Sequence, residues 1–176
     1  MITREALARA KRIKLVGFDV DGVMTDGTLY LADDGQEYKG FSSLDGHGLK
    51  MLRDSGVIPA IVTGRTSRVV EHRAKNLGII HLHQGAHDKL AVFLKLLGEL
   101  GLEAEEAAFM GDDLVDLPVM RRVGLALTVA AAPELVKSHA HYTALREGGR
   151  GAVREVCEWI MRAQGTWQAQ MAPYLA

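Results

Sequence analysis

Two aspartates follow directly on an apolar segment near the start of the chain. The stretch from Leu15 to Asp26 reads Leu-Val-Gly-Phe-Asp-Val-Asp-Gly-Val-Met-Thr-Asp, which places Asp19 and Asp21 two positions apart. In an extended strand, residues at that spacing share one face and lie roughly 6–7 Å apart. Neighbouring anions at the end of a buried strand repel each other and lose solvation, so they need a cation, a proton or a shared reaction. The pair therefore predicts chemistry, with ordinary turn aspartates at a polar strand end as the alternative.

Polar residues also follow the other apolar segments of the chain. Thr63-Gly64-Arg65 comes after the second segment, and Gly111-Asp112-Asp113 comes after the fourth, with Asp116 one helical turn later. Lys89 stands at the start of a predicted helix. In an open parallel sheet, the active crevice lies beyond the carboxyl ends of the strands. We therefore expect one crevice that contains carboxylates, a hydroxyl, an ammonium and a guanidinium group.

These residue types suit the transfer of a phosphoryl group. Asp19, Asp21 and Asp112 supply hard oxygen ligands with excess negative charge, which favours Mg²⁺ over zinc, whose preferred ligands are histidine and cysteine. With the metal bound, Lys89 and the Thr63 hydroxyl can bind the equatorial phosphate oxygens, where negative charge gathers. We thus predict a magnesium site next to a phosphate site.

The carboxylates divide the catalytic roles among themselves. Asp19 comes first after the strand and is the predicted nucleophile, which attacks phosphorus and becomes an aspartyl phosphate. Asp21 then protonates the leaving alcohol and later deprotonates the hydrolytic water. Asp113 and Asp116 are expected to support the site.

Apolar segments alternate with helical patterns along the chain, which is typical of a doubly wound α/β fold with a mainly parallel sheet. Gly78 is expected to end the helix over 66–77, and Thr66 or Ser67 to cap it. The predicted strands are Leu15–Phe18, Val57–Val62, Ile79–Leu82, Ala107–Met110 and Leu125–Val129. After a short N-terminal helix, the predicted helices cover 45–55, 66–77, 88–100, 113–122, 133–138 and 150–163.

One segment breaks the alternation. Within Gly27–Ser43, residues 28–31 and 36–39 read as two short strands around a turn that contains Gly35. We expect a β-hairpin that projects beside the two first aspartates. From Gly27 to Val62 the chain holds only this hairpin, one helix and one strand, so the crevice has no lid of its own. Since open crevices admit water, a macromolecular substrate or a neighbouring subunit must close this one.

The composition favours one globular domain that acts on a small molecule. The chain has 176 residues, is 48% hydrophobic and 24% charged, and carries a formal net charge of -1. It has no basic run and no long apolar stretch, so we expect neither a nucleic acid nor a membrane as partner. The single Cys157 reads as a buried thiol, which fits a reducing cytoplasm. A phosphatase domain over 1–163 and a flexible C-terminal tail over 164–176 are the expected divisions.

The order of these residues resembles the four motifs of the haloacid dehalogenase superfamily. The motifs are Asp19-Val20-Asp21-Gly22-Val23, Thr63, Lys89 and Gly111-Asp112-Asp113. Within that superfamily, the whole chain is similar to the phosphatases of 3-deoxy-D-manno-octulosonate 8-phosphate. The further matching residues are Asp26, Asp45-Gly46-His47-Gly48, Thr63-Gly64-Arg65, Arg73 and the stretch from Gly148 to Glu155.

The resemblance implies a capless, Mg²⁺-dependent hydrolase of lipopolysaccharide precursor synthesis in Gram-negative bacteria. Such an enzyme produces the free sugar acid and phosphate. It is a cytoplasmic homotetramer, in which the hairpins associate and a neighbouring subunit completes the pocket. The tail from Trp167 onward matches no motif, so the resemblance assigns it no role.

The substrate carries a carboxylate as well as a phosphate, and arginine is suited to gripping planar anions. Arg65 and Arg73, eight positions apart on one predicted helix, are therefore the candidates for binding it, in this site or in a neighbour's. Together with Thr63, Gly64 and Lys89 they form the predicted substrate-binding set. Phosphatases of nine-carbon nonulosonate 9-phosphates are the alternative, but they tend to carry Glu at the position of Arg65.

A different functional class uses similar residues. A receiver domain, which holds a phosphoryl group as a signal, also places acidic residues, Thr and Lys around a parallel sheet. The late Asp112-Asp113 pair and the acid/base residue Asp21 argue for an enzyme with turnover instead.

Overall fold

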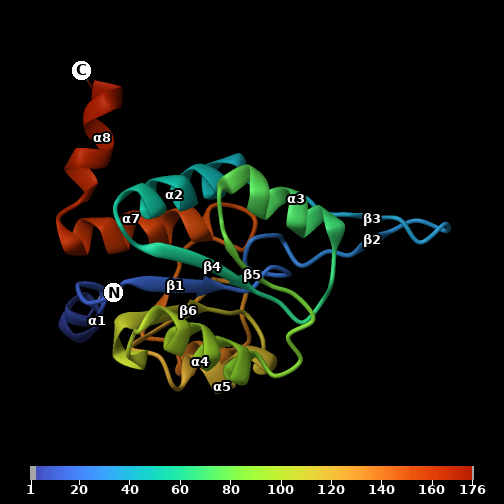
Figure 1. Cartoon of the computed structure of the whole chain (residues 1–176), viewed down its shortest axis with the longest axis horizontal. Helices are drawn as coiled ribbons and strands as arrows, with labels where there is room; N and C mark the ends of the chain where they lie inside the picture. The colour runs from blue at the N-terminus through green and yellow to red at the C-terminus, as the bar shows by residue number, and fades with distance from the viewer. Residues whose placement is uncertain (1–2, 176) are drawn as a thin grey trace.

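A parallel sheet of six strands forms the centre of the molecule, as the computed structural model of residues 3–175 shows (Figure 1). Strand β1, whose four residues are all buried, lies in the middle and pairs with β4 and β6 on its two sides. Burial on both faces explains why this strand reads as an uninterrupted apolar run. The strand order is β5 (His81–His83), β4 (Ile58–Val62), β1 (Leu15–Phe18), β6 (Ala107–Met110), β7 (Leu125–Thr128) and β8 (Tyr142–Thr143).

Helices cover both faces of the sheet, which confirms the predicted doubly wound α/β fold (Figure 1). One face carries α2 (Ser43–Asp54), α3 (Arg68–Leu77) and α7 (Ala152–Gln164), and the other carries α4 (Lys89–Leu100) and α5 (Leu117–Met120). The remaining short elements are α1 (Arg4–Ala10), α6 (Glu134–Ser138) and the 3₁₀ turns η1 (Ala104–Glu106) and η2 (Leu114–Asp116).

The ends of the helices follow local sequence signals. Asp88 caps α4 by accepting a hydrogen bond from the Ala91 amide at 2.9 Å. Gly78 ends α3 with a φ of 70°, as predicted from the sequence. Ser67 stands at the N-cap position of α3, but its side chain makes no capping hydrogen bond.

The predicted hairpin is present and projects from the carboxyl ends of the central strands (Figure 1). It consists of β2 (Tyr30–Leu31) and β3 (Glu37–Tyr38), which pair antiparallel to each other as a separate two-stranded sheet. Gly35 takes a φ of 83° in the turn, a conformation that L side chains rarely adopt. The hairpin thus stands beside the strand end that carries Asp19 and Asp21.

Several elements differ from the sequence prediction. The helix expected over 113–122 is divided into η2 and α5, because the Asp113 and Asp116 side chains bond to main-chain amides at its start. Strand β8 has only two residues, too few for a sequence pattern, and was not predicted.

The last segment also contains an unpredicted element. The stretch 164–176, expected as a flexible tail, contains helix α8 (Trp167–Leu175), which extends away on the opposite side from the hairpin (Figure 1). Among residues 3–175, no helix has both the length and the apolar character that crossing a bilayer requires.

Candidate active site

A cavity of about 300 Å³ lies at the carboxyl edge of the sheet and gathers most of the predicted site residues. The first two aspartates, the Thr63–Arg65 turn, Lys89 and the Asp112–Asp113 pair all line it. Of the predicted site residues, only Arg73 and Asp116 do not. The full lining consists of Asp19, Asp21, Thr63, Gly64, Arg65, Ala86, His87, Lys89, Asp112, Asp113 and Val115.

The packing of α4 on β1 brings Lys89 to Asp19. Phe93 of α4 lies against Gly17 of β1, where a Cβ would collide with the phenyl ring. Lys89 precedes Phe93 by four residues on the helix, and Asp19 follows Gly17 by two on the strand, so each pair shares one face. As a result, Lys89 Nζ lies 3.0 Å from Asp19 Oδ2.

Asp116 connects Lys89 to the loop that carries Asp112. It is fully buried, and its Oδ1 lies 2.6 Å from Lys89 Nζ. Its Oδ2 accepts hydrogen bonds from the backbone amides of Asp112 and Asp113, at 3.0 and 3.2 Å. Burial alone lowers the pKa of Lys89, but the carboxylates of Asp19 and Asp116 outweigh it and raise that pKa above its usual value. The lysine is therefore a fixed cation at the back of the cavity.

Three carboxylates meet closely enough to hold a metal ion. Oxygen atoms of Asp19, Asp112 and Asp116 all lie within 4.8 Å of one another. Both oxygens of Asp116 are already committed to Lys89 and to the two amides. Asp112 Oδ1, by contrast, is buried and has no hydrogen-bond partner among residues 3–175. An orphaned buried carboxylate oxygen is a costly arrangement that a cation would relieve, so Asp19 and Asp112 fit a divalent ion.

The electrostatics of the two carboxylates agree with this assignment. Burial and the neighbouring charges of Asp19, Asp116 and Asp113 raise the pKa of Asp112 to about 7. Burial and the charge of Asp116 likewise raise the pKa of Asp19 to about 6, against the opposing effect of Lys89. The protein alone therefore carries more negative charge here than its own cations balance.

Of the predicted ligand set, Asp19 and Asp112 bring their carboxylates together, and Asp21 as a ligand stays a prediction. The structure groups Asp116, and not Asp21, with the other two carboxylates. The Asp21 carboxylate turns instead toward Lys39, whose Nζ lies 2.5 Å from Asp21 Oδ1. The spacing of two residues correctly indicated a shared strand end, but it could not reveal this competing cation.

Glycine permits the close approach of the two acidic loops. Gly22 has a φ of 92°, and a Cβ at this position would overlap the Asp112 carboxylate. Gly22 is thus required twice, for its backbone conformation and for the space beside it. The glycine of the motif Asp19-Val20-Asp21-Gly22 therefore lies at the point where the Asp112 side chain packs against this loop.

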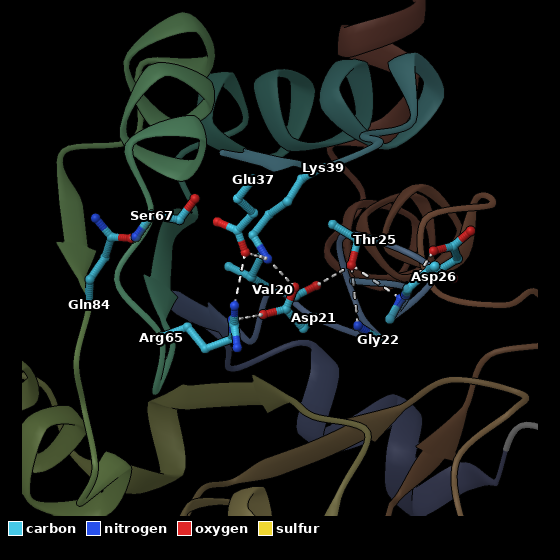
Figure 2. A network of polar contacts seen from close by, with 12 residues as sticks. Val20, Asp21, Gly22, Thr25, Asp26, Glu37, Lys39, Arg65, Ser67 and Gln84 are labelled. Carbon is cyan, nitrogen blue, oxygen red and sulfur yellow. Dashed lines mark hydrogen bonds and ion pairs between the residues drawn. The ribbon is translucent and has the colours of Figure 1, made fainter. Parts of the chain in front are cut away.

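Lys39 and Glu37 of the hairpin are functional candidates that the sequence analysis did not single out. Figure 2 shows Lys39, Glu37 and Arg65 gathered around Asp21. Arg65 Nη2 lies 3.1 Å from Glu37 Oε1, and Arg65 Nε lies 3.7 Å from Asp21 Oδ2. The alternation of Glu37, Tyr38 and Lys39 was the available signal, since residues two apart on a strand face the same side.

The two predicted substrate arginines lie in different environments. Helix α3 begins at Arg68, so Arg65 belongs to the preceding loop and the two are not on one helix. Arg73 donates a hydrogen bond to the Ser42 carbonyl at 2.9 Å and lies over the Phe41 ring, away from the cavity. The structure therefore separates Arg73 from the other candidates within this chain.

A larger cavity, of about 830 Å³, lies at the opposite edge of the sheet among residues that precede β1, β4 and β6. Its lysines and arginines, including Lys11 and Arg162, stand near the C-terminal ends of α1 and α7, where cations complement the helix dipole. Its one carboxylate, Glu106, pairs with Lys14 at 2.6 Å. The carboxylates suited to catalysis therefore line the smaller cavity, which we take as the candidate active site.

Comparisons with known proteins agree with this arrangement. A model of the haloacid dehalogenase-like hydrolases matches residues 29–124. The chain is 47% identical over 163 residues to the 3-deoxy-D-manno-octulosonate 8-phosphate phosphatase of Yersinia pestis, covering 93% of this chain and 87% of that one.

Two solved structures are similar over nearly the whole chain. A probable phosphatase of Pseudomonas syringae is 54% identical with a TM-score of 0.97, and the match covers 99% of both chains. The 3-deoxy-D-manno-octulosonate 8-phosphate phosphatase of Moraxella catarrhalis, in complex with a magnesium ion, a phosphate ion and the sugar acid, is 43% identical with a TM-score of 0.95. That match covers 98% of this chain and 99% of the other.

Proposed function

The chain belongs to the haloacid dehalogenase-like hydrolases and is a phosphoric monoester hydrolase, and from this we propose that it hydrolyses 3-deoxy-D-manno-octulosonate 8-phosphate. The products are the free sugar acid and phosphate, in the synthesis of lipopolysaccharide precursors in the cytoplasm. One observation carries the chemistry: the carboxylates of the buried Asp19 and the half-buried Asp112 share a cavity with the fixed cation Lys89. Curated relatives of similar length with this activity support the substrate.

Mg²⁺ is the proposed cofactor, held by the carboxylates of Asp19 and Asp112, with Asp21 as the third predicted ligand. The all-carboxylate donor set favours a hard cation that keeps several waters and binds a substrate phosphate. The magnesium ion in the relative from Moraxella catarrhalis supports the same choice. When bound, the ion offsets the carboxylate charge and polarises the phosphoryl group. Asp116 supports the site by orienting Lys89 and the Asp112 loop.

In the first half of the proposed reaction, a carboxylate oxygen of Asp19 attacks phosphorus. The bond between phosphorus and the ester oxygen breaks, and Asp21 donates a proton to the departing sugar alcohol. Lys89 and the Thr63 hydroxyl stabilise the charge on the equatorial oxygens. Thr63 suits this role because it is 3% exposed and lines the cavity at the end of β4.

In the second half, water hydrolyses the aspartyl phosphate. Asp21, now ionised, accepts a proton from the attacking water, and the bond between phosphorus and the Asp19 oxygen breaks. Asp19 returns as a carboxylate and phosphate is released. A phosphoacceptor receiver would stop before this half, and the curated relatives, which are named as phosphatases, favour full turnover.

Arg65 is the proposed determinant of the sugar acid. It lines the cavity beside Thr63 and Gly64, and its side chain is 47% exposed, so its guanidinium can reach a substrate carboxylate. Arg73 lies away from this cavity, so it can bind the substrate only in the site of a neighbouring subunit. The nine-carbon nonulosonate 9-phosphates remain a second candidate substrate, but the curated relatives favour the eight-carbon acid.

A comparison of phosphate release from the two sugar-acid phosphates tests the substrate. We expect the wild type to prefer the eight-carbon compound in kcat/KM, and Arg65→Glu to weaken that preference by roughly tenfold, since a charge-assisted contact to the carboxylate is lost. Lys50→Glu, which reverses a charge outside the cavity lining, is the control. A preference for the nine-carbon compound would contradict the proposed substrate, and an unchanged preference in Arg65→Glu would contradict the role of Arg65.

A homotetramer assembled through the hairpins is the proposed active form. The hairpin exposes Leu29, Tyr30, Leu31 and Tyr38, at 45%, 50%, 65% and 61%. Large apolar side chains gathered on one projecting element are typical of a protein interface. Light scattering after size exclusion should give four subunits for the wild type and fewer for Leu31→Asp. A wild-type monomer would contradict the proposal.

A further inference from the structure

The hairpin and the catalytic loop are joined by a closed ring of four alternating charges, drawn in Figure 2. Lys39 Nζ lies 2.5 Å from Asp21 Oδ1 and 3.1 Å from Glu37 Oε1. Arg65 closes the ring, 3.1 Å from Glu37 and 3.7 Å from Asp21 Oδ2. Two anions and two cations thus hold one another in place.

Lys39 is the most deeply buried member of this ring. Its side chain is 1% exposed, compared with 20% for Asp21, 16% for Glu37 and 47% for Arg65. Lysine is rarely buried to this extent unless it is paired. Asp21 and Arg65 line the cavity, whereas Lys39 and Glu37 do not. Lys39 therefore contacts Asp21 from behind, on the side away from the substrate.

The strand geometry of the hairpin places Lys39 next to the Asp21 carboxylate. Glu37 and Lys39 are two residues apart, so both side chains point toward the site, while Tyr38 between them is 61% exposed. A short lysine contact to one oxygen and the arginine near the other fix both ends of the Asp21 carboxylate. A carboxylate that transfers protons in two successive steps needs such a fixed orientation.

We propose that Lys39 is a positioning residue, which orients the Asp21 carboxylate for proton transfer and thereby makes the hairpin part of the catalytic machinery. This rests on the acid/base role of Asp21 in the proposed function. The competing explanation is that the ring only anchors the hairpin. The two explanations differ in what happens to the second half of the reaction when Lys39 loses its charge.

An aryl phosphate separates the two halves of the reaction. p-Nitrophenolate leaves without the help of a proton, so formation of the phosphoenzyme from p-nitrophenyl phosphate does not depend on Asp21. Hydrolysis of the phosphoenzyme does. In rapid-mixing experiments with magnesium chloride, Lys39→Met should release a burst of p-nitrophenolate equal to the enzyme concentration. Its steady-state kcat should then fall about ten- to a hundredfold, the size of loss that a misplaced catalytic group causes.

Three further variants decide between the explanations. Lys39→Arg keeps the charge and should retain most of the steady-state rate. Glu37→Gln leaves the contact between Lys39 and Asp21 intact and should lower kcat by less than about threefold, whereas hairpin anchoring predicts a loss as large as that of Lys39→Met. Lys95→Met is the matched control, because that side chain is 78% exposed and its ion pair within residues 3–175 is with the exposed Glu99, at 3.8 Å.

A double-mutant cycle completes the test. If Lys39 acts through Asp21, then Asp21→Asn combined with Lys39→Met should be no slower than Asp21→Asn alone. Losses that multiply, or a Lys39→Met protein without a burst that still folds by circular dichroism, would overturn the proposal. The test is independent of the sugar, so a wrong substrate assignment does not affect it. If Asp21→Asn itself gives no burst, that result contradicts the proposed reaction steps and not the positioning role of Lys39.

Discussion

The carboxylate of Asp116 lies 2.6 Å from the ammonium group of Lys89, and neither side chain is more than 5% exposed. The other oxygen of this carboxylate accepts hydrogen bonds from the backbone amides of Asp112 and Asp113. Asp116 therefore fixes two parts of the site at once, the proposed phosphate-binding cation Lys89 and the loop that carries the proposed metal ligand Asp112. Its role is indirect, through the groups that it holds.

Replacement of Asp116 by alanine should destabilise the protein and lower its activity. The change leaves a buried lysine with one partner fewer and two amides without an acceptor, so the free energy of unfolding should fall by about 2 kcal/mol. Asp113→Ala is the control, since Asp113 is exposed and loses only its capping bonds from the amides of Leu114 and Asp116, worth about 1 kcal/mol. Urea unfolding measures both. Equal losses in the two variants would contradict the account of Asp116.

A methyl group at Gly22 should disrupt the site more than the same change in the hairpin turn. Gly22 and Gly35 have similar φ values of 92° and 83°, so alanine strains the backbone comparably at both, by roughly 1 kcal/mol. Only at Gly22 would the added Cβ overlap Asp112, because nothing lies within 4 Å of the position at Gly35. Phosphate release by Gly22→Ala should fall at least tenfold further than by Gly35→Ala. Similar activities would show that the close approach is unimportant.

The stability of the metal-free protein should fall as the pH rises. Burial and neighbouring carboxylates raise the pKa of Asp112 to about 7 and that of Asp19 to about 6, from the ordinary value of 3.8. The folded protein thus holds protons that the unfolded chain has released, between about pH 4 and pH 7, and loses stability across this range. Mg²⁺ binds the ionised carboxylates, so its stabilising effect should grow over the same interval.

Thermal unfolding with EDTA and with magnesium chloride, at about pH 5 and about pH 7.5, measures both effects. Asp112→Asn removes one of the two anions, so it should lose most of the magnesium-induced shift in Tm and most of the pH dependence. A chelated wild type whose Tm rises across this interval would contradict the electrostatic account of the site.

The sequence predicted the sheet well because its strands are buried on both faces. Leu15–Phe18 and Ala107–Met110 read as short apolar runs and form strands with those same bounds. The residues directly after these runs then had to lie at one edge, as Asp19 and Asp112 do. Strand β8 and helix α8 lacked such a signal, since one has two residues and the other has no fully buried residue.

The contacts between distant charged groups could not be predicted in the same way. Whether Arg73 faces a substrate or the Phe41 ring depends on packing that its position on a helix does not reveal. The pairing of Lys39 with Asp21 depends on where the hairpin stands relative to the end of β1. The proposed nucleophile, the cation and the proposed metal-binding loop follow from the order of strands, whereas the side chains that position them emerge only from tertiary structure.

Detection of the phosphoenzyme tests the central claim, that Asp19 becomes an aspartyl phosphate, most directly. The variants Asp19→Asn and Asp21→Asn are incubated with 3-deoxy-D-manno-octulosonate 8-phosphate or p-nitrophenyl phosphate and magnesium chloride, quenched in acid, and analysed by intact mass and peptide mapping. We predict that Asp21→Asn accumulates a phosphoryl group on Asp19, because its hydrolysis lacks a base, and that Asp19→Asn carries none. A phosphoryl group on Asp19→Asn, or one mapped to a residue other than Asp19 in Asp21→Asn, would contradict the mechanism.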